Sequence, residues 1–397
     1  MTVPSRPAPE EDARTRGLVS VTPLGGQTRD QIVAAARAQG FAGGDAELRE
    51  AVRHDVVRYR VVYRTRTPDG RPTTASGLLV LPRTTTREAA LPTVLHTHGS
   101  MMARDRAPSV NTQGTDHVAA LVYAAGGRVT LAPDYLGLGL GPGRHPFMDI
   151  ASTVSTSLDL LRVSPAALAQ VAPDRRARVA LDGSVYVTGF SQGGQAAMGV
   201  SRALAGGAVP SFRLRGLAPV GGEYDLERVE IPGLFDGRVN ATAGVMATAY
   251  FLTAQQHLSS PPLYTDPATV FRPPYATYVE DLFDGEHSQD EVVQKLPGTL
   301  EELVTDEWYA ALHRPAGPLL DALRRNDTTC AWAPKVPVTL YTAAGDQEAP
   351  RDNTLSCARQ LAAHGVTARI VDHGSVGHEG AFQHSVIPIA ETFPRGD

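Results

Sequence analysis

The sequence predicts an α/β fold: a mostly parallel, twisted sheet of eight strands, with helices on both faces and an inserted helical cap. Short apolar runs alternate with helical stretches of ten or more residues, a pattern typical of strands joined by crossover helices. Two strand-like runs near the N-terminus are joined by a turn, so an antiparallel hairpin precedes the parallel part. The alternation breaks once, from residue 222 to residue 330, where no clear strand is found.

Residues 1–50 are expected to form an N-terminal extension. Residues 1–17 are rich in Pro, Arg and Glu, and we expect a loose tail there. Thr28–Gln39 is expected to be a short helix, with Thr28 as its N-cap and Gly40 as its stop.

The sheet domain is expected to comprise residues 51–222 and 331–397. Its hairpin strands are Val56–Arg66 and Thr73–Leu81, with Pro68, Asp69 and Gly70 in the turn. The six later strands are expected at Pro92–His96, Arg128–Ala132, Ser184–Thr188, Leu214–Val220, Pro337–Thr342 and Thr367–Val371. The helices are expected at Thr115–Ala125, Met148–Gln170, Gln192–Ala205, Asp352–Ala363 and Ala381–Thr392.

The remaining segment, residues 223–330, is predicted to be a mostly helical cap over the sheet. It holds 11 of the 24 aromatic residues, enough to supply either a core of its own or a lining for a binding pocket. Tyr250, Phe251, Phe271 and Tyr275 are the aromatic residues for which both roles stay open. Its helices are expected near Ala241–Gln256, Tyr275–Leu282 and Leu300–His313.

Composition excludes several classes of protein. An apolar content of 42% with a net charge of −5 is incompatible with general disorder. The balance of 37 basic against 42 acidic residues gives no electrostatic basis for binding nucleic acid. No apolar run reaches the roughly 18 residues of a membrane span. The N-terminus lacks an apolar signal segment, so we expect a cytoplasmic protein, or a secreted one if a leader is missing from the sequence.

The sequence has two cysteines, Cys330 and Cys357, in no zinc-binding pattern. They are expected to form either one disulfide or two small buried thiols. A disulfide would suit an exported protein better than a cytoplasmic one. The sequence gives no indication of the oligomeric state.

The segment Ser184–Ala197 carries the motif that indicates chemistry. Gly189-Phe190-Ser191-Gln192-Gly193 has the G-x-S-x-G pattern, between a strand-like run and a helical stretch. This is the context of a nucleophile elbow, a turn so tight that glycine is needed on both sides of the serine. The turn holds the hydroxyl above the sheet, at a helix N-terminus that favours negative charge. Ser191 is therefore the candidate nucleophile.

An activated serine needs a histidine base and an acid that orients the base. In this arrangement the acid and then the histidine follow the serine along the chain. Asp346 falls just after a strand, where open α/β sheets place their sites, with Glu348 and Asp352 as rivals. His378 lies in a glycine-flanked loop before the last helix, and we choose it as the base. Its rival is His373, whereas His384 would lie within the last helix and is expected to be structural.

Stabilising the tetrahedral intermediate requires an oxyanion hole. We expect the backbone N–H of Gln192 as one donor and that of Ser100 as the other, with Gly99 and Met101 as rivals to Ser100. His98, Gly99, Met101 and Tyr135 are expected to contact the substrate, with bracing of the serine loop as the alternative for Tyr135. His96 and His98 have no third ligand spaced nearby, so no metal site is expected.

With these motifs, the chain resembles the α/β-hydrolase superfamily, and within it the secretory lipase-like serine carboxylesterases of bacteria and fungi. The resemblance covers roughly residues 17–393. The matching elements are GFSQGG around Ser191, PDYLGLG with the later HP pair, PVGGEYDL after a strand, the GD pair at Asp346 and GHEGA at His378. The resemblance implies a Ser191, Asp346 and His378 triad that needs no cofactor and acts on a small-molecule ester.

The resulting prediction is a serine hydrolase that cleaves carboxylic esters through an acyl-enzyme. Two alternatives use the same acylated serine. In one, an alcohol or amine of a secondary metabolite intercepts the acyl group, as in an acyltransferase or cyclising enzyme. In the other, the scissile bond is an amide and the protein is a peptidase.

Overall fold

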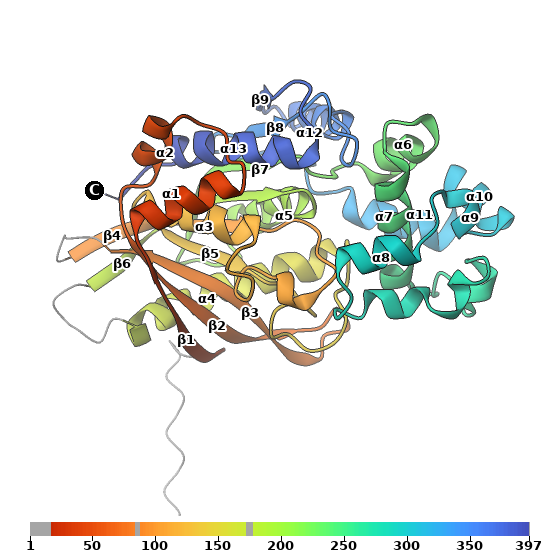
Figure 1. Ribbon diagram of the computed structural model, residues 1–397, viewed down its shortest axis with the longest axis horizontal. Helices are drawn as coiled ribbons and strands as arrows, with labels where there is room; N and C mark the ends of the chain where they lie inside the picture. Colours follow the sequence, from red (N-terminus) through yellow and green to blue (C-terminus); the bar gives the residue numbers. More distant parts are fainter. Residues whose placement is uncertain (1–16, 84–87, 172–177, 397) are drawn as a thin grey trace, which may run out of the picture.

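The computed structural model describes residues 17–83, 88–171 and 178–396, and the tail predicted for residues 1–17 lies almost wholly outside these ranges. The chain forms one nine-stranded sheet in the order β1-β2-β3-β5-β4-β6-β7-β8-β9 (Figure 1). The pairings among β1, β2, β3 and β5 are antiparallel, whereas those from β5 through β4 to β9 are parallel. The strands are β1 (Leu18–Gln27), β2 (Val56–Arg66), β3 (Pro72–Pro82), β4 (Glu88–Thr97), β5 (Val129–Pro133), β6 (Arg178–Phe190), β7 (Arg213–Val220), β8 (Thr339–Thr342) and β9 (Arg369–Asp372).

The predicted fold class is confirmed, but the sheet has nine strands where the sequence predicts eight. The extra strand is β1, at the edge of the sheet beside β2. Its side chains are mostly exposed and its pairing with β2 is interrupted near Leu18 and Pro23. β1 contains Gly and Pro and lies at the edge of the sheet. It therefore lacks the alternation of apolar and polar residues by which strands are recognised in a sequence.

Helices cover both faces of the sheet. The apolar side chains of α4, α5 and α12 form one core with the strands, and those of α1, α2, α3 and α13 form a second core on the opposite face. Thr28 caps α1 as predicted, accepting a hydrogen bond from the N–H of Gln31. The bounds are α1 (Arg29–Ala38), α2 (Asp45–Ala51), η1 (Arg104–Arg106), α3 (Thr115–Ala125), α4 (Ile150–Val171), α5 (Gln192–Ala205), α12 (Asp352–Ala363) and α13 (His378–Thr392).

Between β7 and β8 the chain is helical and gathers at one end of the sheet (Figure 1, green to cyan). The elements are η2 (Leu226–Glu230), α6 (Ile231–Asp236), α7 (Ala241–Gln256), η3 (Pro267–Thr269), η4 (Tyr275–Thr277), η5 (Val279–Phe283), α8 (Gln289–Lys295), α9 (Leu300–Leu303), α10 (Asp306–His313) and α11 (Gly317–Asn326). We call this segment the cap; its boundaries at 223 and 330 stay predictions. Two predicted helices are each split: Tyr275–Leu282 forms η4 and η5, and Leu300–His313 forms α9 and α10, where Thr305 caps the second helix.

The cap has its own apolar core. Tyr250 and Phe271 are fully buried in it, together with Met102 and Phe147 from the sheet domain. Of the four cap aromatics that could serve two roles, these two are therefore core residues. Among the described residues, no helix combines the length and hydrophobicity needed to cross a lipid bilayer.

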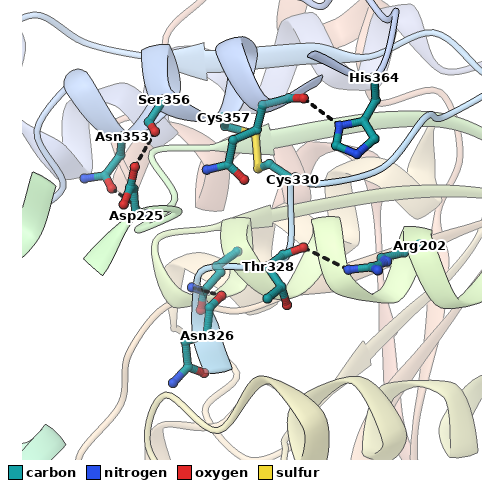
Figure 2. The surroundings of a disulfide bond; sticks show 11 residues. Arg202, Asp225, Asn326, Thr328, Cys330, Asn353, Ser356, Cys357 and His364 are labelled. Carbon is teal, nitrogen blue, oxygen red and sulfur yellow. Dashed lines mark hydrogen bonds between the residues drawn. A yellow bond between two sulfur atoms is a disulfide. The ribbon is translucent and has the colours of Figure 1, made fainter. Parts of the chain in front are cut away.

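Both ends of the cap are tied to the sheet domain, as Figure 2 shows for the region around the disulfide. Cys330, which follows α11, is disulfide-bonded to Cys357 in α12. Asp225, at the start of the cap, accepts a hydrogen bond from the hydroxyl of Ser356, and its N–H donates to the Asn353 side chain at 3.1 Å. The cap therefore enters and leaves beside the same helix, α12.

Candidate active site

Ser191 occupies a sharp turn between β6 and α5. Its φ of 56° and ψ of −125° are strained for a residue with a side chain. The turn persists because the Ser191 N–H donates to Val220 O at 3.0 Å and the Gly194 N–H donates to Ser191 O at 2.7 Å. The hydroxyl is thereby held at the positive end of α5, where developing negative charge is favoured.

The two glycines of the pentapeptide are needed because the chain passes too close for a side chain. A Cβ on Gly189 would lie 2.2 Å from Gly193 O, and one on Gly193 would lie 2.1 Å from Thr97 O. Both contacts are with backbone atoms, which cannot rotate away. The sequence reasoning about this motif therefore agrees with the packing of β4, β6 and α5.

His378, at the start of α13, and Asp346, in the loop after β8, lie side by side. The Nδ1 atom of His378 is 2.7 Å from Oδ2 of Asp346, and both residues are buried. The other carboxylate oxygen of Asp346 accepts hydrogen bonds of 2.9 Å from the N–H groups of Glu348 and Ala349. Because an ionised carboxylate can only accept, Nδ1 of His378 carries the proton and Nε2 is left as an acceptor.

The surroundings of His378 keep it basic. Burial by itself lowers the pKa of the imidazole, but the hydrogen bond and charge of Asp346, with the charges of Glu348 and Glu223, outweigh burial and raise that pKa above its ordinary value. His378 is also the first residue of α13, after Gly377, and not part of a loop that ends at Ala381 as the sequence suggested. Its backbone is consequently fixed by the helix.

None of the rival acids and bases forms a histidine–carboxylate pair at Ser191 among the described residues. Asp352 forms an ion pair with Arg238 at 2.7 Å. Glu348 contributes its backbone N–H to Asp346, and its side chain is exposed at the cavity. His373 faces the Ser385 hydroxyl at 2.9 Å, and its ring lies 5.5 Å from that of His384. Of the candidates, Asp346 and His378 are the pair that the structure brings together.

Ser191 and His378 line one cavity of about 740 Å³. Gly99, Ser100 and Met101, from the loop after β4, line it as well. Gln192 is the first residue of α5, so its N–H has no acceptor within that helix. Of the two positions expected for the oxyanion hole, Ser100 therefore lines the cavity with Ser191, and Gln192 directly follows Ser191 in the chain.

Gln192 is held from behind by a histidine that the sequence reasoning left without a role. The Gln192 amide nitrogen is 3.0 Å from Nε2 of His145, whose Nδ1 lies 2.9 Å from Leu136 O. Burial lowers the pKa of His145 to about 4, so the ring is neutral and can accept from Gln192 while donating to Leu136. The His145-Pro146 pair after the glycine-rich loop was the sequence feature that could have indicated this contact with Gln192.

His98 and Tyr135, which the sequence placed among the substrate contacts, do not line the cavity. Both are fully buried and their rings stack at 3.9 Å between centroids. The Tyr135 hydroxyl donates to His98 O at 3.0 Å, and burial lowers the pKa of His98. His98 O also lies against Gly193, so His98 and Tyr135 support the turn at Ser191. Neither side chain lines the cavity in which a ligand would bind.

The sequence reasoning missed two acidic side chains of the cavity, Glu223 and Glu230. Burial is the main cause that raises the pKa of Glu223 to about 7, and the charges of Asp346 and Glu348 act in the same direction, against His378. Burial and the charge of Glu223 likewise raise the pKa of Glu230. Glu223 belongs to the PVGGEYDL motif, which follows a strand. The sequence around Glu223 does not indicate whether its carboxyl group faces a cavity or the surface.

No grouping of three or more His, Cys, Asp or Glu side chains within the described ranges could hold a metal ion. His96, one of the two histidines considered as a ligand, instead lies 2.8 Å from the Asp116 carboxylate.

Neither protein-family models nor curated proteins gave a match to the sequence. A comparison with solved structures did give matches. LipA of Xanthomonas oryzae, described as a rice cell wall degrading esterase, is 26% identical with a TM-score of 0.83, over 96% of this chain and 98% of that one. A putative hydrolase of Legionella pneumophila is 23% identical with a TM-score of 0.81, over 94% and 96% of the two chains.

Candida antarctica lipase A is more distant, at 16% identity and a TM-score of 0.64, over 92% of this chain and 78% of the lipase. These likenesses agree with the architecture of the sheet and with the motifs around Ser191. The chain therefore has the α/β-hydrolase fold and resembles the lipases and esterases that share it.

Proposed function

We propose that the protein is a carboxylic ester hydrolase that works through an acyl-enzyme on Ser191. The observation that carries the proposal is that Ser191 and His378 line one cavity, with His378 hydrogen-bonded to Asp346. The likeness to LipA, an esterase, supports the same reaction class.

In the proposed mechanism, Ser191 Oγ attacks the ester carbonyl carbon while His378 Nε2 takes the hydroxyl proton. Asp346 stabilises the imidazolium that forms, through the 2.7 Å hydrogen bond to Nδ1. The N–H groups of Gln192 and Ser100 stabilise the oxyanion, and His378 then protonates the departing alcohol. Water, deprotonated by His378, attacks the acyl-Ser191 carbonyl; the bond to Ser191 Oγ then breaks, His378 returns the proton to Oγ, and the acid is released.

Acyl transfer and peptide cleavage would use the same groups. Nothing in the described part of the structure favours either over ester hydrolysis, so hydrolysis of esters is the reaction that we propose.

The test combines covalent labelling with turnover. A fluorophosphonate probe and p-nitrophenyl esters of increasing chain length are applied to the wild type, to Ser191→Ala and to Ser288→Ala, a control serine that also lines the cavity. We expect labelling and hydrolysis in the wild type and the control, and loss of both in Ser191→Ala. Unchanged labelling or hydrolysis in a folded Ser191→Ala protein would contradict the proposal.

A further inference from the structure

The loop that carries Asp346 is hydrogen-bonded to the cap through Asn240, which directly precedes α7. The Asn240 N–H donates to Gln347 O at 2.8 Å, and the Nδ2 group of its side chain donates to the same oxygen at 3.2 Å. Gln347 follows Asp346 directly in the chain. The cap therefore contacts the backbone beside the acid of the proposed triad, and the mechanism above makes no use of this contact.

The Gln347 carbonyl belongs to the peptide unit whose N–H points at Asp346. Gln347 C=O and Glu348 N–H are the two ends of one peptide bond, and the Glu348 N–H donates to Oδ1 of Asp346 at 2.9 Å. A trans peptide is planar, with its C=O and N–H on opposite sides, so fixing the direction of the carbonyl also fixes the direction of the N–H. Hydrogen bonds at the two ends of a peptide also strengthen each other. Asn240 is thus linked through one rigid unit to the carboxylate whose Oδ2 is 2.7 Å from His378 Nδ1.

The Asn240 side chain has a second partner. Its Oδ1 accepts a hydrogen bond of 2.9 Å from the N–H of Ala243 and so caps the N-terminus of α7. The amide oxygen serves the helix while the amide nitrogen serves the Gln347 carbonyl, and an aspartate, which only accepts when ionised, can do the first but not the second. Asn240 is not among the described residues that line the cavity, so it does not act by touching an ester bound there.

We propose that Asn240 is a positioning residue for the triad: through the Gln347–Glu348 peptide it helps to hold the Asp346 carboxylate against His378. The inference rests on the proposed ester hydrolysis and gives one residue of the cap a role in the reaction itself. Without the Nδ2 donor, the carbonyl keeps only its bond from the Asn240 N–H, and the carboxylate gains freedom to turn away from the imidazole. The imidazolium of the transition state is then less stabilised, which lowers kcat and leaves KM nearly unchanged.

The test separates the donor to Gln347 from the cap of α7. Asn240→Ala removes both, whereas Asn240→Asp keeps the cap and removes the donor. Hydrolysis of p-nitrophenyl butyrate is measured at about pH 8, where the new aspartate is ionised. We expect kcat to fall about two- to tenfold in both variants, the range for one neutral hydrogen bond, with little change in KM. The negative charge of the new aspartate would favour the imidazolium, so charge does not account for a fall in kcat.

Thr305→Ala is the matched control, because it removes the N-cap of another cap helix, α10, without a contact to the Asp346 loop. We expect it to lower stability as Asn240→Ala does, but to leave kcat unchanged. Asn240→Asp should retain most of the stability, so it still tests the inference if Asn240→Ala fails to fold. Wild-type kcat in folded Asn240→Asp overturns the inference, since the side chain would then serve only the helix. An equal fall of kcat in Thr305→Ala also overturns it, because general loosening of the cap would be the cause.

A pH profile gives a readout that a merely structural role would not move. The hydrogen bond and charge of Asp346 raise the pKa of His378, so a less firmly held carboxylate should lower that pKa. The acidic midpoint of kcat/KM is therefore expected at lower pH in Asn240→Ala than in the wild type, and unmoved in Thr305→Ala. A midpoint that stays in place or rises in folded Asn240→Ala counts against the inference.

The two proposals fail in different ways. If the wild type does not hydrolyse p-nitrophenyl esters, ester hydrolysis itself is refuted. If the wild type hydrolyses them and the Asn240 variants match it in kcat and in the acidic midpoint, the positioning role alone is refuted.

Discussion

The two walls of the cavity are built by different means. The sheet wall carries Ser191 and His378, with Asp346 hydrogen-bonded to His378, and it is fixed by backbone contacts at the ends of β6, β8 and β9. The cap wall consists of side chains from η2, α6 and α7, packed on a separate core. Backbone packing leaves little freedom for substitution, whereas side chains can be exchanged without moving the chain. We infer that the first wall sets the reaction and the second sets which ester is accepted.

The largest expected effect is on the sheet wall. Asp346→Asn should lower kcat by about 10⁴-fold, because an amide cannot hold the imidazole in the required tautomer or stabilise its charged form. Asp352→Asn, at the start of α12, should change kcat little, since Asp352 pairs with Arg238. Steady-state hydrolysis of a p-nitrophenyl ester measures both. Similar losses in the two variants would mean that the chosen acid is wrong.

The disulfide tests how firmly the cap is anchored. It joins residues 27 apart in sequence, and removing it in Cys330→Ala/Cys357→Ala should lower the free energy of unfolding by about 3–4 kcal/mol, through the greater freedom of the unfolded chain. Urea unfolding followed by circular dichroism gives the value. Reductant present during unfolding should destabilise the wild type and leave the variant unaffected. Equal responses to reductant would show that the bond is absent in solution.

Adding a methyl group at Gly193 tests whether the turn that carries Ser191 depends on close backbone packing. Gly193→Ala places its Cβ against Thr97 O and should cost about 1–3 kcal/mol in stability, with a loss of activity because Ser191 shifts. Gly298→Ala is the control in the cap, where the nearest atom to the added Cβ is 3.8 Å away. Thermal unfolding and esterase activity separate the two. If neither substitution changed stability or activity, the sheet wall would be as tolerant as the cap, and the difference between the two walls would be refuted.

The smallest effect concerns pH. His378 must be neutral to take the serine proton, and its pKa is raised, so kcat/KM should fall on acidification with a midpoint above 6.5. Glu348 contributes to the raised pKa, so Glu348→Gln should move this midpoint to lower pH. Asp290→Asn should leave it in place. A midpoint that moves upward in Glu348→Gln would contradict the electrostatic account of the site.

The same contrast explains how far the sequence could predict the molecule. The elbow, the acid and the histidine each follow a strand within a few residues, so local pattern and chain order were enough to choose Ser191, Asp346 and His378. His98 and Tyr135 lie in equally conspicuous motifs, yet they point away from the cavity, because motif position does not reveal which face a loop side chain takes.

The cap side of the cavity was beyond sequence reasoning for a different reason. Glu223 and Glu230 become cavity residues through the packing of η2 against α11 and α12, which involves residues about a hundred positions apart. The pairing of Cys330 with Cys357 also depends on this packing, and the sequence left it open. The cytoplasmic location expected from the sequence stays a prediction, and disulfides are more common in oxidising compartments.

The most direct test of the central claim is to trap the acyl-enzyme. The protein is mixed with a p-nitrophenyl ester, quenched in acid within the first turnovers, and mapped by peptide mass spectrometry. The account predicts one acyl group, on the peptide that carries Ser191, and no adduct in Ser191→Ala. An acyl group on another residue, or undiminished ester turnover by folded Ser191→Ala, would contradict it.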